Sequence, residues 1–180
     1  MSHLVKVQQS VETANGLPNE FYTDPTVFAE ETKRLLLGQW SGIAFAGDVP
    51  EVGDVYPVEL AGVPLVLVRD RDNQVRVYEN VCRHRGMILV GEAGKARQGM
   101  RCPYHSWTYD LNGRLIATPL VGGPDANHHP CIHKPDLGLL EVPAHVYLGV
   151  VYVNVSRDAG PFKQMHSKLL DRWAEFEQPL

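Results

Sequence analysis

Two short loops restrict what this chain can fold into more than any other feature of the sequence. The first loop offers one thiol and one imidazole as C-x-H, at Cys82 and His84. After seventeen intervening residues, the second loop offers the same two groups as C-x-x-H, at Cys102 and His105. Thiolate sulfur and imidazole nitrogen are ligands for soft and borderline metals. The pattern therefore predicts a metal centre that joins the two loops.

Two kinds of metal centre suit this ligand set. A single Zn²⁺ binds two Cys and two His in a tetrahedral site, although zinc fingers usually place both cysteines on one loop and both histidines on the other. In a Rieske [2Fe–2S] centre two thiolates hold one iron and two imidazoles hold the other, so each loop must reach both irons. Pro103 stiffens the second turn by fixing its φ angle. Because each loop carries one Cys and one His, the pattern favours the Rieske centre, and a zinc site is the alternative.

The residues around the two loops resemble the Rieske signature of the ring-hydroxylating (Rieske non-haem iron) oxygenases, of the alpha-subunit type. That family reads C-x-H-R-G and then C-x-Y-H-G-W, which 82–86 and 102–107 match except that Ser106 replaces the usual Gly. This difference affects the expected backbone angle at residue 106 and one expected hydrogen bond to the cluster. The likeness runs from about residue 17 to the end. It implies a [2Fe–2S] cluster held by Cys82, His84, Cys102 and His105.

The resemblance also implies roles for residues beside the ligands. Arg85 is kept in the family, and with Arg83 and Arg101 it would favour the more negative reduced cluster and so raise its potential. Tyr104 and Trp107 are candidates to donate a hydrogen bond to cluster sulfur, to shield the cluster from water, or simply to fill the core. We expect shielding from Trp107. The two histidines would turn their outer N–H groups toward a redox partner.

Charge and composition exclude several classes of protein. The 180 residues carry 17 basic and 21 acidic side chains without a polybasic block, which argues against nucleic acid and anionic membranes as partners. No run of eighteen apolar residues and no apolar signal core occurs, so the sequence predicts a cytoplasmic protein. Cys131 is then a free thiol. The loops lack the extra cysteines of the respiratory-chain Rieske type, which favours an oxygenase or ferredoxin type.

The hydrophobic pattern predicts an all-β, mainly antiparallel fold with one flanking helix at each end. The resemblance makes this a Rieske-type iron–sulfur domain of stacked small antiparallel sheets. Asp24 and Pro25 are typical of a helix start, and Gly38 of a helix end, so a packing helix is expected between them. Period-two segments with turn residues between them indicate short strands; they are 40–45, 54–60, 64–69, 74–78, 139–142 and 146–155.

Three segments make up the expected domain organisation. Residues 1–16 are an arm, 17–160 are the Rieske domain, and 161–180 form an amphipathic helix. In the resembled family a catalytic domain follows this helix, and these 180 residues contain no candidate for it. The strand at 146–155 is so apolar that both its faces should be covered, and Asn112-Gly113 predicts the turn of a hairpin that supports the second loop.

One motif in the connection 117–136 imitates a second metal site. Asp125, His128 and His133 spell D-x-x-H-x-x-x-x-H, the spacing that these oxygenases use for their mononuclear iron, and two His with one carboxylate suit Fe(II). Pro124 and Pro130 argue against the helix that such a site needs. In the family the triad also comes far later, in the catalytic domain. We therefore expect a polar surface loop here.

The resemblance implies one-electron transfer as the function. Electrons would come from a ferredoxin or a flavin-dependent reductase and pass to an O₂-activating mononuclear Fe(II) in the catalytic domain of the same or a neighbouring subunit. The intact family is often trimeric, so a homo-oligomer is possible. One alternative is a stand-alone Rieske ferredoxin, an electron carrier and not an enzyme. Another is a zinc-stabilised β module that acts in protein interaction.

Overall fold

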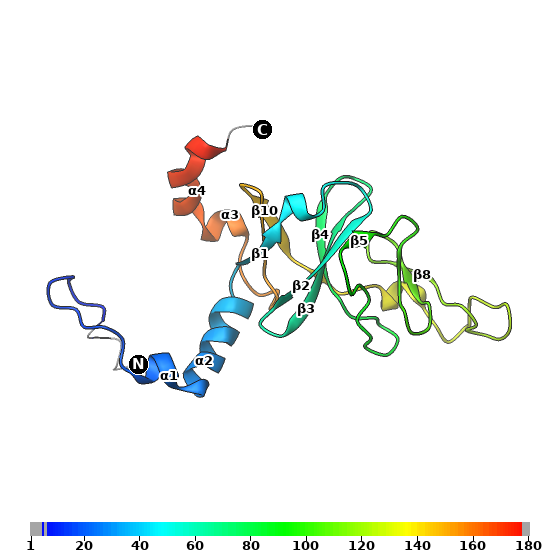
Figure 1. The fold of residues 1–180 in the computed structure, drawn as a ribbon, viewed down its shortest axis with the longest axis horizontal. Helices are drawn as coiled ribbons and strands as arrows, with labels where there is room; N and C mark the ends of the chain where they lie inside the picture. The colour runs from blue at the N-terminus through cyan, green and yellow to red at the C-terminus, as the bar shows by residue number, and fades with distance from the viewer. Residues whose placement is uncertain (1–4, 6, 178–180) are drawn as a thin grey trace.

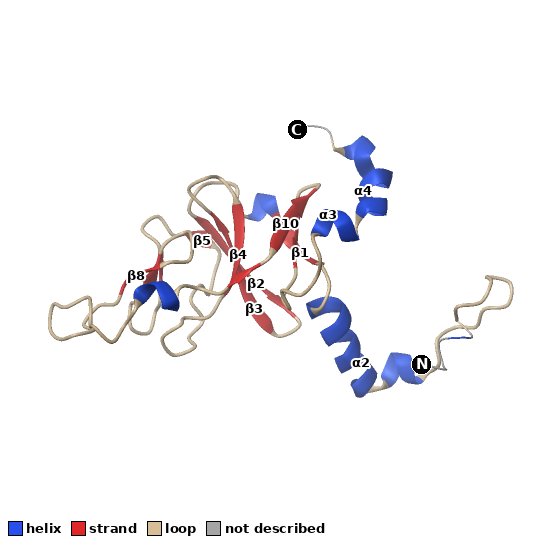
Figure 2. Cartoon of the chain, turned by 180° about the vertical axis from the view of Figure 1, so that it is seen from behind, coloured by secondary structure: helices blue, strands red, loops and turns tan. Residues whose placement is uncertain are grey.

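The computed structural model describes residues 5 and 7–177, and its body consists of three antiparallel sheets with the α-helices at one end (Figures 1 and 2). This confirms the predicted fold class. A five-stranded sheet has the order β5-β2-β3-β4-β9, and the two three-stranded sheets have the orders β1-β11-β10 and β6-β7-β8. The strands are β1 Ser41–Phe45, β2 Asp54–Leu60, β3 Val63–Arg69, β4 Val75–Glu79, β5 Gly94–Lys95, β6 Met100–Arg101, β7 Thr108–Tyr109, β8 Leu115–Ala117, β9 Glu141–Val142, β10 Ala144–Tyr147 and β11 Val150–Val153.

The five-stranded sheet separates two hydrophobic cores. Successive side chains of a strand point to opposite faces. On β3, Leu65 and Leu67 therefore enter the core shared with β1, β10 and β11, while Val66 and Val68 enter the core shared with the two metal loops. All four are fully buried. The second core also contains both candidate ligand thiols, so the metal loops are packed directly onto the central sheet.

The segment predicted as one strand at 146–155 is a hairpin, which corrects that prediction. β10 and β11 pair in antiparallel register, with Tyr147 opposite Val150. The two residues between them, Leu148 and Gly149, both have positive φ angles, 48° and 79°. This is the backbone of a two-residue turn that matches the twist of the strands. Leu at the first turn position hid the turn, because residues other than Gly and Asn rarely adopt this conformation.

The N-terminal helix begins and ends where the sequence predicts, but its apolar side chains stay exposed. α1 Glu20–Thr23 precedes α2 Pro25–Glu31, which continues as the π-helix η2 Thr32–Leu37 up to Gly38. Asp24 caps α2 by accepting a hydrogen bond from the Thr26 amide at 2.7 Å. Among the described residues these helices bury none of their own side chains, and Phe28 is 68% exposed. The expected packing against the body is therefore not present.

The helix expected over 161–180 is two short helices in the described part. α3 Phe162–Met165 ends at His166, whose φ of −114° interrupts the helix, and α4 Ser167–Trp173 then leads into the 3₁₀ turn η5 Ala174–Phe176. Of the expected apolar face only Phe162 is buried; it stacks on His145 with ring centroids 4.4 Å apart. Residues 178–180 lie outside the described part.

Two further 3₁₀ turns complete the description, η3 Ala46–Asp48 and η4 Lys134–Leu137. Of the expected arm, residues 7–16 form only turns and bends and lead away from the sheets (Figure 1). Within the described residues no helix combines the length and the apolar character needed to cross a membrane.

Candidate metal centre

The two metal loops have the same backbone hydrogen bonds although their sequences differ. In each loop the cysteine amide donates to the carbonyl five residues later, at 2.8 Å in both cases. In each loop the amide four residues after the cysteine donates back to the cysteine carbonyl, at 3.0 Å. The turns between these bonds cover 83–85 and 103–105. Each loop therefore presents its Cys and its His from the same compact turn.

The fourth residue after each cysteine must adopt a left-handed backbone. Gly86 has a φ of 72° and Ser106 has a φ of 59°. The Ser that departs from the family pattern thus occupies the position of a Gly and keeps its backbone angle. Its Oγ accepts a hydrogen bond from Arg101 Nη2 at 2.8 Å. A non-Gly residue in this conformation costs roughly 1–2 kcal/mol.

Substitutions at these two positions should shift the free energy of unfolding in opposite directions. Ser106→Gly removes the left-handed strain and should raise the free energy of unfolding by about 0.5–1 kcal/mol, after the entropy cost of Gly is subtracted. Gly86→Ala has open space around the new Cβ, so only the φ of 72° opposes it, and it should lower that free energy by about 1 kcal/mol. Urea unfolding measures both, and a destabilised Ser106→Gly protein would contradict the strain argument.

Asn80 fastens the first loop to the central sheet. Its side chain is buried, donates from Nδ2 to the Val90 carbonyl at 2.7 Å and accepts from the Val90 amide at 2.9 Å. Its backbone amide donates to the Pro64 carbonyl on β3. The second loop is held instead by β6 and β7, where Arg101 pairs with Thr108. Sequence reasoning did not single out Asn80, because its partners are ten residues away or more.

The structure brings the four candidate ligands together as two pairs of like atoms. Cys82 and Cys102 are each only 2% exposed, and their thiols are close enough for Cys82 to influence the Cys102 titration. His84 and His105 are half-buried, and their rings meet edge to face with centroids 4.8 Å apart. The sulfur pair therefore lies inside and the imidazole pair lies nearer the surface. This is the division that a centre with one sulfur-bound and one nitrogen-bound iron needs.

Within the described part of the chain, one ring nitrogen of the imidazole pair is buried without a hydrogen bond. His105 Nδ1 is buried and has no hydrogen-bond partner among the described residues. A buried polar atom without a partner costs about 1–3 kcal/mol, so a bound group that accepts this nitrogen as a ligand explains it. Within the described residues no three His, Cys, Asp or Glu side chains surround a point that could hold a single metal ion. The residues present fit a two-iron cluster.

The surroundings favour uncharged imidazole at the surface pair. Burial lowers the pKa of His84, and the charges of His105 and Arg85 lower it further. Neutral imidazole is the form that binds a metal. At the inner pair, burial raises the pKa of the Cys102 thiol.

Both aromatic residues that the sequence singled out contact the imidazoles. Trp107 is 4% exposed and stacks on His84, with centroids 4.5 Å apart and planes 8° from parallel. Tyr104 is 57% exposed and its ring lies 3.7 Å from that of His105. Trp107 thus covers one imidazole from inside the core, while Tyr104 lies over the other from the solvent side.

Tyr109 contacts a candidate ligand, and sequence reasoning missed it. It is fully buried on β7, and its Oη lies 3.4 Å from Cys82 Sγ. The same Oη accepts a hydrogen bond from the Arg83 amide at 3.0 Å, which leaves its own proton free to point at the sulfur. Burial raises the pKa of Tyr109 well above its usual range, with the contact to Cys82 as the next cause. The available signal was an aromatic residue on the strand directly after the second loop.

The remaining predicted residues lie at the surface. Arg83, Arg85 and Arg101 are exposed next to the candidate ligands in the chain. Asp125, His128 and His133 belong to an exposed loop without helix, as the prolines predicted. His133 Nδ1 lies 3.0 Å from Asp136 Oδ2.

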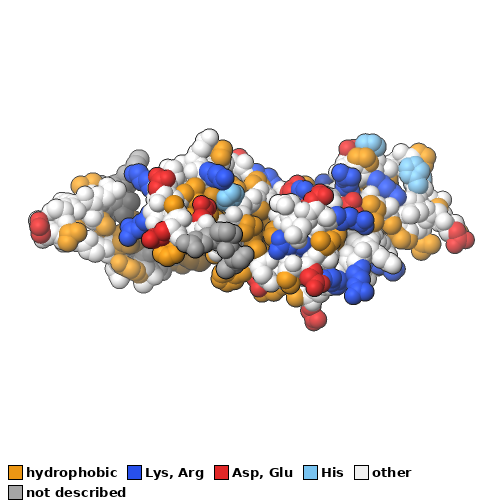
Figure 3. Space-filling model, turned by 90° about the horizontal axis from the view of Figure 1, so that it is seen from above, with side chains coloured by type: hydrophobic (Ala, Val, Ile, Leu, Met, Phe, Trp, Pro, Cys, Tyr) orange, Lys and Arg blue, Asp and Glu red, His pale blue; other side chains and the backbone are white. Residues whose placement is uncertain are grey.

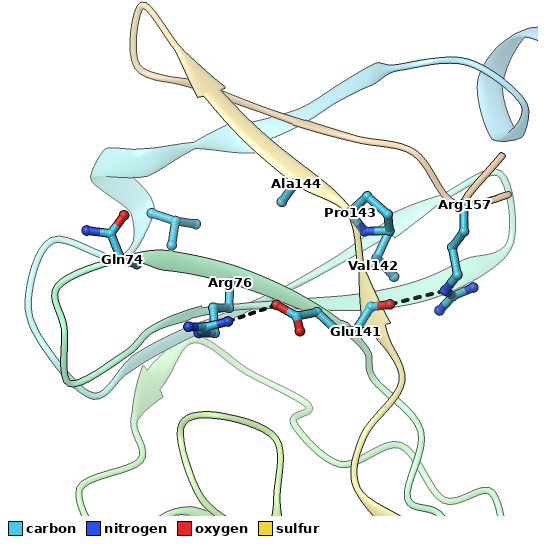
Figure 4. A pocket seen from close by; sticks show the side chains of 8 residues that line it. Gln74, Arg76, Glu141, Val142, Pro143, Ala144 and Arg157 are labelled. Carbon is cyan, nitrogen blue, oxygen red and sulfur yellow. Dashed lines mark hydrogen bonds and ion pairs between the residues drawn. The ribbon is translucent and has the colours of Figure 1, made fainter. Parts of the chain in front are cut away.

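A hollow of about 480 Å³ lies between β4, β9 and β10, away from the candidate ligands (Figure 4). It contains two arginines, and both are neutralised. Arg76 binds Glu141 at 3.0 Å and the buried Asp70 at 2.6 Å. Arg157 binds Glu79 at 2.9 Å and also donates to the Glu141 carbonyl. These contacts connect neighbouring strands, and each arginine of the hollow has a carboxylate partner.

Comparison with known proteins identifies the class of this fold and site. Residues 39–134 match the Rieske [2Fe–2S] domain family, and the chain belongs to that family. The cofactor of the family is a Rieske-type [2Fe–2S] cluster, and its function is one-electron transfer. The resemblance drawn from the two motifs is thereby confirmed.

The relatives are oxygenase subunits. The chain is 33% identical over 155 residues to 2-aminobenzenesulfonate 2,3-dioxygenase subunit alpha of Alcaligenes sp., covering 84% of this chain and 38% of that protein. It is 31% identical over 143 residues to the carnitine monooxygenase oxygenase subunit of Escherichia coli (strain K12), covering 79% and 37%. The solved structure of the quaternary ammonium Rieske monooxygenase CntA superimposes with a TM-score of 0.80 at 26% identity, covering 90% of this chain and 44% of that one. The chain thus spans less than half the length of each.

Proposed function

We propose that Cys82 and Cys102 bind one iron of the [2Fe–2S] cluster and that His84 and His105 bind the other. The pairing of sulfur with sulfur and imidazole with imidazole carries this assignment. The unpartnered His105 Nδ1 supports it, because iron ligation would satisfy that atom. When bound, the cluster supplies a centre that accepts and releases one electron. The protein residues hold it, exclude water from its sulfur side, and set its potential.

The protein works in this proposal as the electron-transfer domain of a Rieske non-haem iron oxygenase. It takes electrons from a ferredoxin or a flavin-dependent reductase in the cytoplasm, and passes them to an O₂-activating mononuclear iron in a catalytic domain. The relatives support this, since they are oxygenase subunits and this chain aligns with only part of their length. Because these relatives include a dioxygenase and a monooxygenase, both types of parent enzyme are compatible with the proposal.

The surface around the imidazole pair suits contact with such a catalytic domain. Met87, Ile88 and Tyr104 are 44%, 41% and 57% exposed. Exposed Met and Tyr beside Arg are typical of protein interfaces. The structure of a related quaternary ammonium monooxygenase is described as giving insights into inter-subunit electron transfer. The proposed acceptor is therefore the catalytic domain of the same or a neighbouring subunit, in a homo-oligomer.

The residues beside the ligands have separate proposed tasks. Trp107 covers His84 from the core and keeps water away from the cluster. Arg85 follows His84 in the chain, and its charge adds to burial and to His105 in lowering the pKa of His84. The same positive charge favours the electron that reduction adds, so it raises the potential. Tyr109 donates a hydrogen bond to the Cys82 sulfur, which is stronger when the sulfur is more negative.

Removing that hydrogen bond should lower the reduction potential. For Tyr109→Phe we expect a fall of roughly 40 mV, since a hydrogen bond worth about 1 kcal/mol is lost mainly from the reduced state. Tyr78→Phe is the matched control, because Tyr78 is equally buried and its hydroxyl donates to the Leu111 carbonyl instead. Potentiometric titration measures both proteins. Equal potentials for the two variants would show that Tyr109 does not tune the centre.

The proposed cofactor is tested by iron and acid-labile sulfide per chain, with the electron paramagnetic resonance spectrum of the reduced protein. Two irons, two sulfides and a rhombic signal with a low average g value are expected. Zinc without sulfide would overturn the proposal. Replacing both His128 and His133 by Ala should leave the iron content unchanged. A loss of one iron in that variant would mean that the exposed loop holds a metal of its own.

A further inference from the structure

A basic hollow adjoins the second metal loop. It has a volume of about 550 Å³ and lies directly beside the candidate ligands Cys102 and His105, because its wall includes their chain neighbours Arg101 and Ser106. No Asp or Glu is among its lining residues. The side chains that give it its polar character are Lys95, Arg97, Gln98, Arg101, Ser106 and Thr108.

Two arginines of the hollow carry uncompensated charge. Arg97 and Arg101 are exposed, and in the part of the chain that the structure describes neither forms an ion pair. Lys95 is different, because Glu51 and Asp54 hold it at 2.6 Å and 2.9 Å. The arginines Arg34, Arg76 and Arg157, which lie elsewhere, are each paired with a carboxylate.

The charged residues are also distributed unevenly along the sequence. Residues 81–138, which include both metal loops, contain seven Lys and Arg and four Asp and Glu. The rest of the chain contains ten basic and seventeen acidic residues. In Figure 3 the Lys and Arg side chains accordingly gather over the end that carries the metal loops. The part of the chain that carries the metal loops is therefore net positive, while the rest of the chain is net negative.

We propose that this hollow is the docking site for an acidic surface of the electron-donating protein. The inference rests on the proposed function and names the chemistry of its donor. Positive charge without internal partners is complementary to carboxylates on a partner, and such complementarity steers encounter and fixes orientation. Docking there places the donor next to the loop of Cys102 and His105. One electron then passes from the reduced donor to the oxidised cluster.

The test uses the iron-loaded protein and a reduced plant-type [2Fe–2S] ferredoxin of negative net charge as the probe. Its potential of about −400 mV suffices to reduce a Rieske centre. The variant is Arg97→Glu, and the matched control is Lys168→Glu on α4, an exposed residue at the opposite end of the molecule with the same change of charge (Figure 1). Stopped-flow absorbance gives the second-order rate constant of cluster reduction.

At low ionic strength Arg97→Glu should slow reduction at least about fivefold, while Lys168→Glu stays within about twofold of the unaltered protein. At about 0.5 M salt the difference should disappear, because exposed charges are then screened. The reduction potential and the electron paramagnetic resonance signal should be the same in all three proteins. Rate constants that are equal for the two variants, with intact spectra, would overturn the docking site alone.

Two oxidants that are small ions distinguish a docking site for a protein from a binding site for a small anion. Reoxidation of the reduced protein by ferricyanide should slow in Arg97→Glu, and reoxidation by a tripositive cobalt complex should accelerate. A change with ferricyanide but none with the ferredoxin would contradict docking of a protein donor. Absence of the cluster from the unaltered protein would instead overturn the proposed function, and the inference with it.

Discussion

His105→Cys is expected to retain a [2Fe–2S] cluster and to lower its reduction potential by on the order of 200 mV or more. The physical reason is charge: a thiolate adds one negative charge where a neutral imidazole bound, and this disfavours the added electron. The shift leads from the Rieske range, roughly −150 to +300 mV, toward the value of about −400 mV for clusters with four cysteines. Potentiometry with the visible spectrum measures it.

His133→Cys is the matched control for this prediction. His133 is an exposed histidine of the 117–136 connection, paired with Asp136 and not with the candidate ligands. Its replacement should leave the potential unchanged. An unchanged potential in His105→Cys would mean that His105 is not a ligand. If that variant does not assemble a cluster, His84→Cys makes the same test on the other imidazole.

Asp70→Asn is expected to lower the free energy of unfolding by about 3 kcal/mol. The Asp70 side chain is fully buried in the turn between β3 and β4. Its Oδ1 accepts from the amides of Asp72 and Gln74, at 2.9 Å and 2.8 Å, and its Oδ2 accepts from Arg76 Nε at 2.6 Å. An Asn retains one acceptor oxygen but turns an NH₂ group toward the Arg76 guanidinium. Thermal unfolding should shift by roughly 6–12 °C for a chain of this size.

Asp72→Asn is the control, because Asp72 is exposed in the same turn and its side chain makes no ion pair among the described residues. It should change stability by less than about 0.5 kcal/mol. If Asp70→Asn is no less stable than Asp72→Asn, the buried ion pair does not hold this hairpin. The hairpin matters to the site because β4 leads directly into the first metal loop.

The stability that Asp70 supplies should disappear in acid. Burial alone would raise the pKa of Asp70, but the amide of Gln74, the guanidinium of Arg76 and the amide of Asp72 outweigh it and hold the pKa below its ordinary value of 3.8. A carboxylate with a depressed pKa in the folded state stabilises fully above that ordinary value, and the contribution falls as pH drops through the folded pKa. The difference between the unaltered protein and Asp70→Asn should therefore shrink below about pH 4.

Much of the fold could be predicted from the sequence, because its signals are local. Apolar runs and apolar–polar alternation, bounded by turn residues, marked β2, β3 and β4 to within a residue or two. Asp24 with Pro25 marked the start of α2, and the cap is present. The hairpin β10–β11 and the break at His166 were missed because an apolar pattern reports burial and says little about where the backbone turns.

The candidate ligands and the class of the domain followed from the sequence by itself, since C-x-H and C-x-x-H are patterns of neighbouring residues whose chemistry does not depend on the rest of the chain. Only the tertiary structure decided that thiol lies beside thiol and imidazole beside imidazole, that Tyr109 reaches Cys82, and that Asn80 clamps the first loop. These are contacts between residues ten to twenty-seven positions apart. They depend on how the strands are paired and stacked, and no local pattern of residues encodes that pairing.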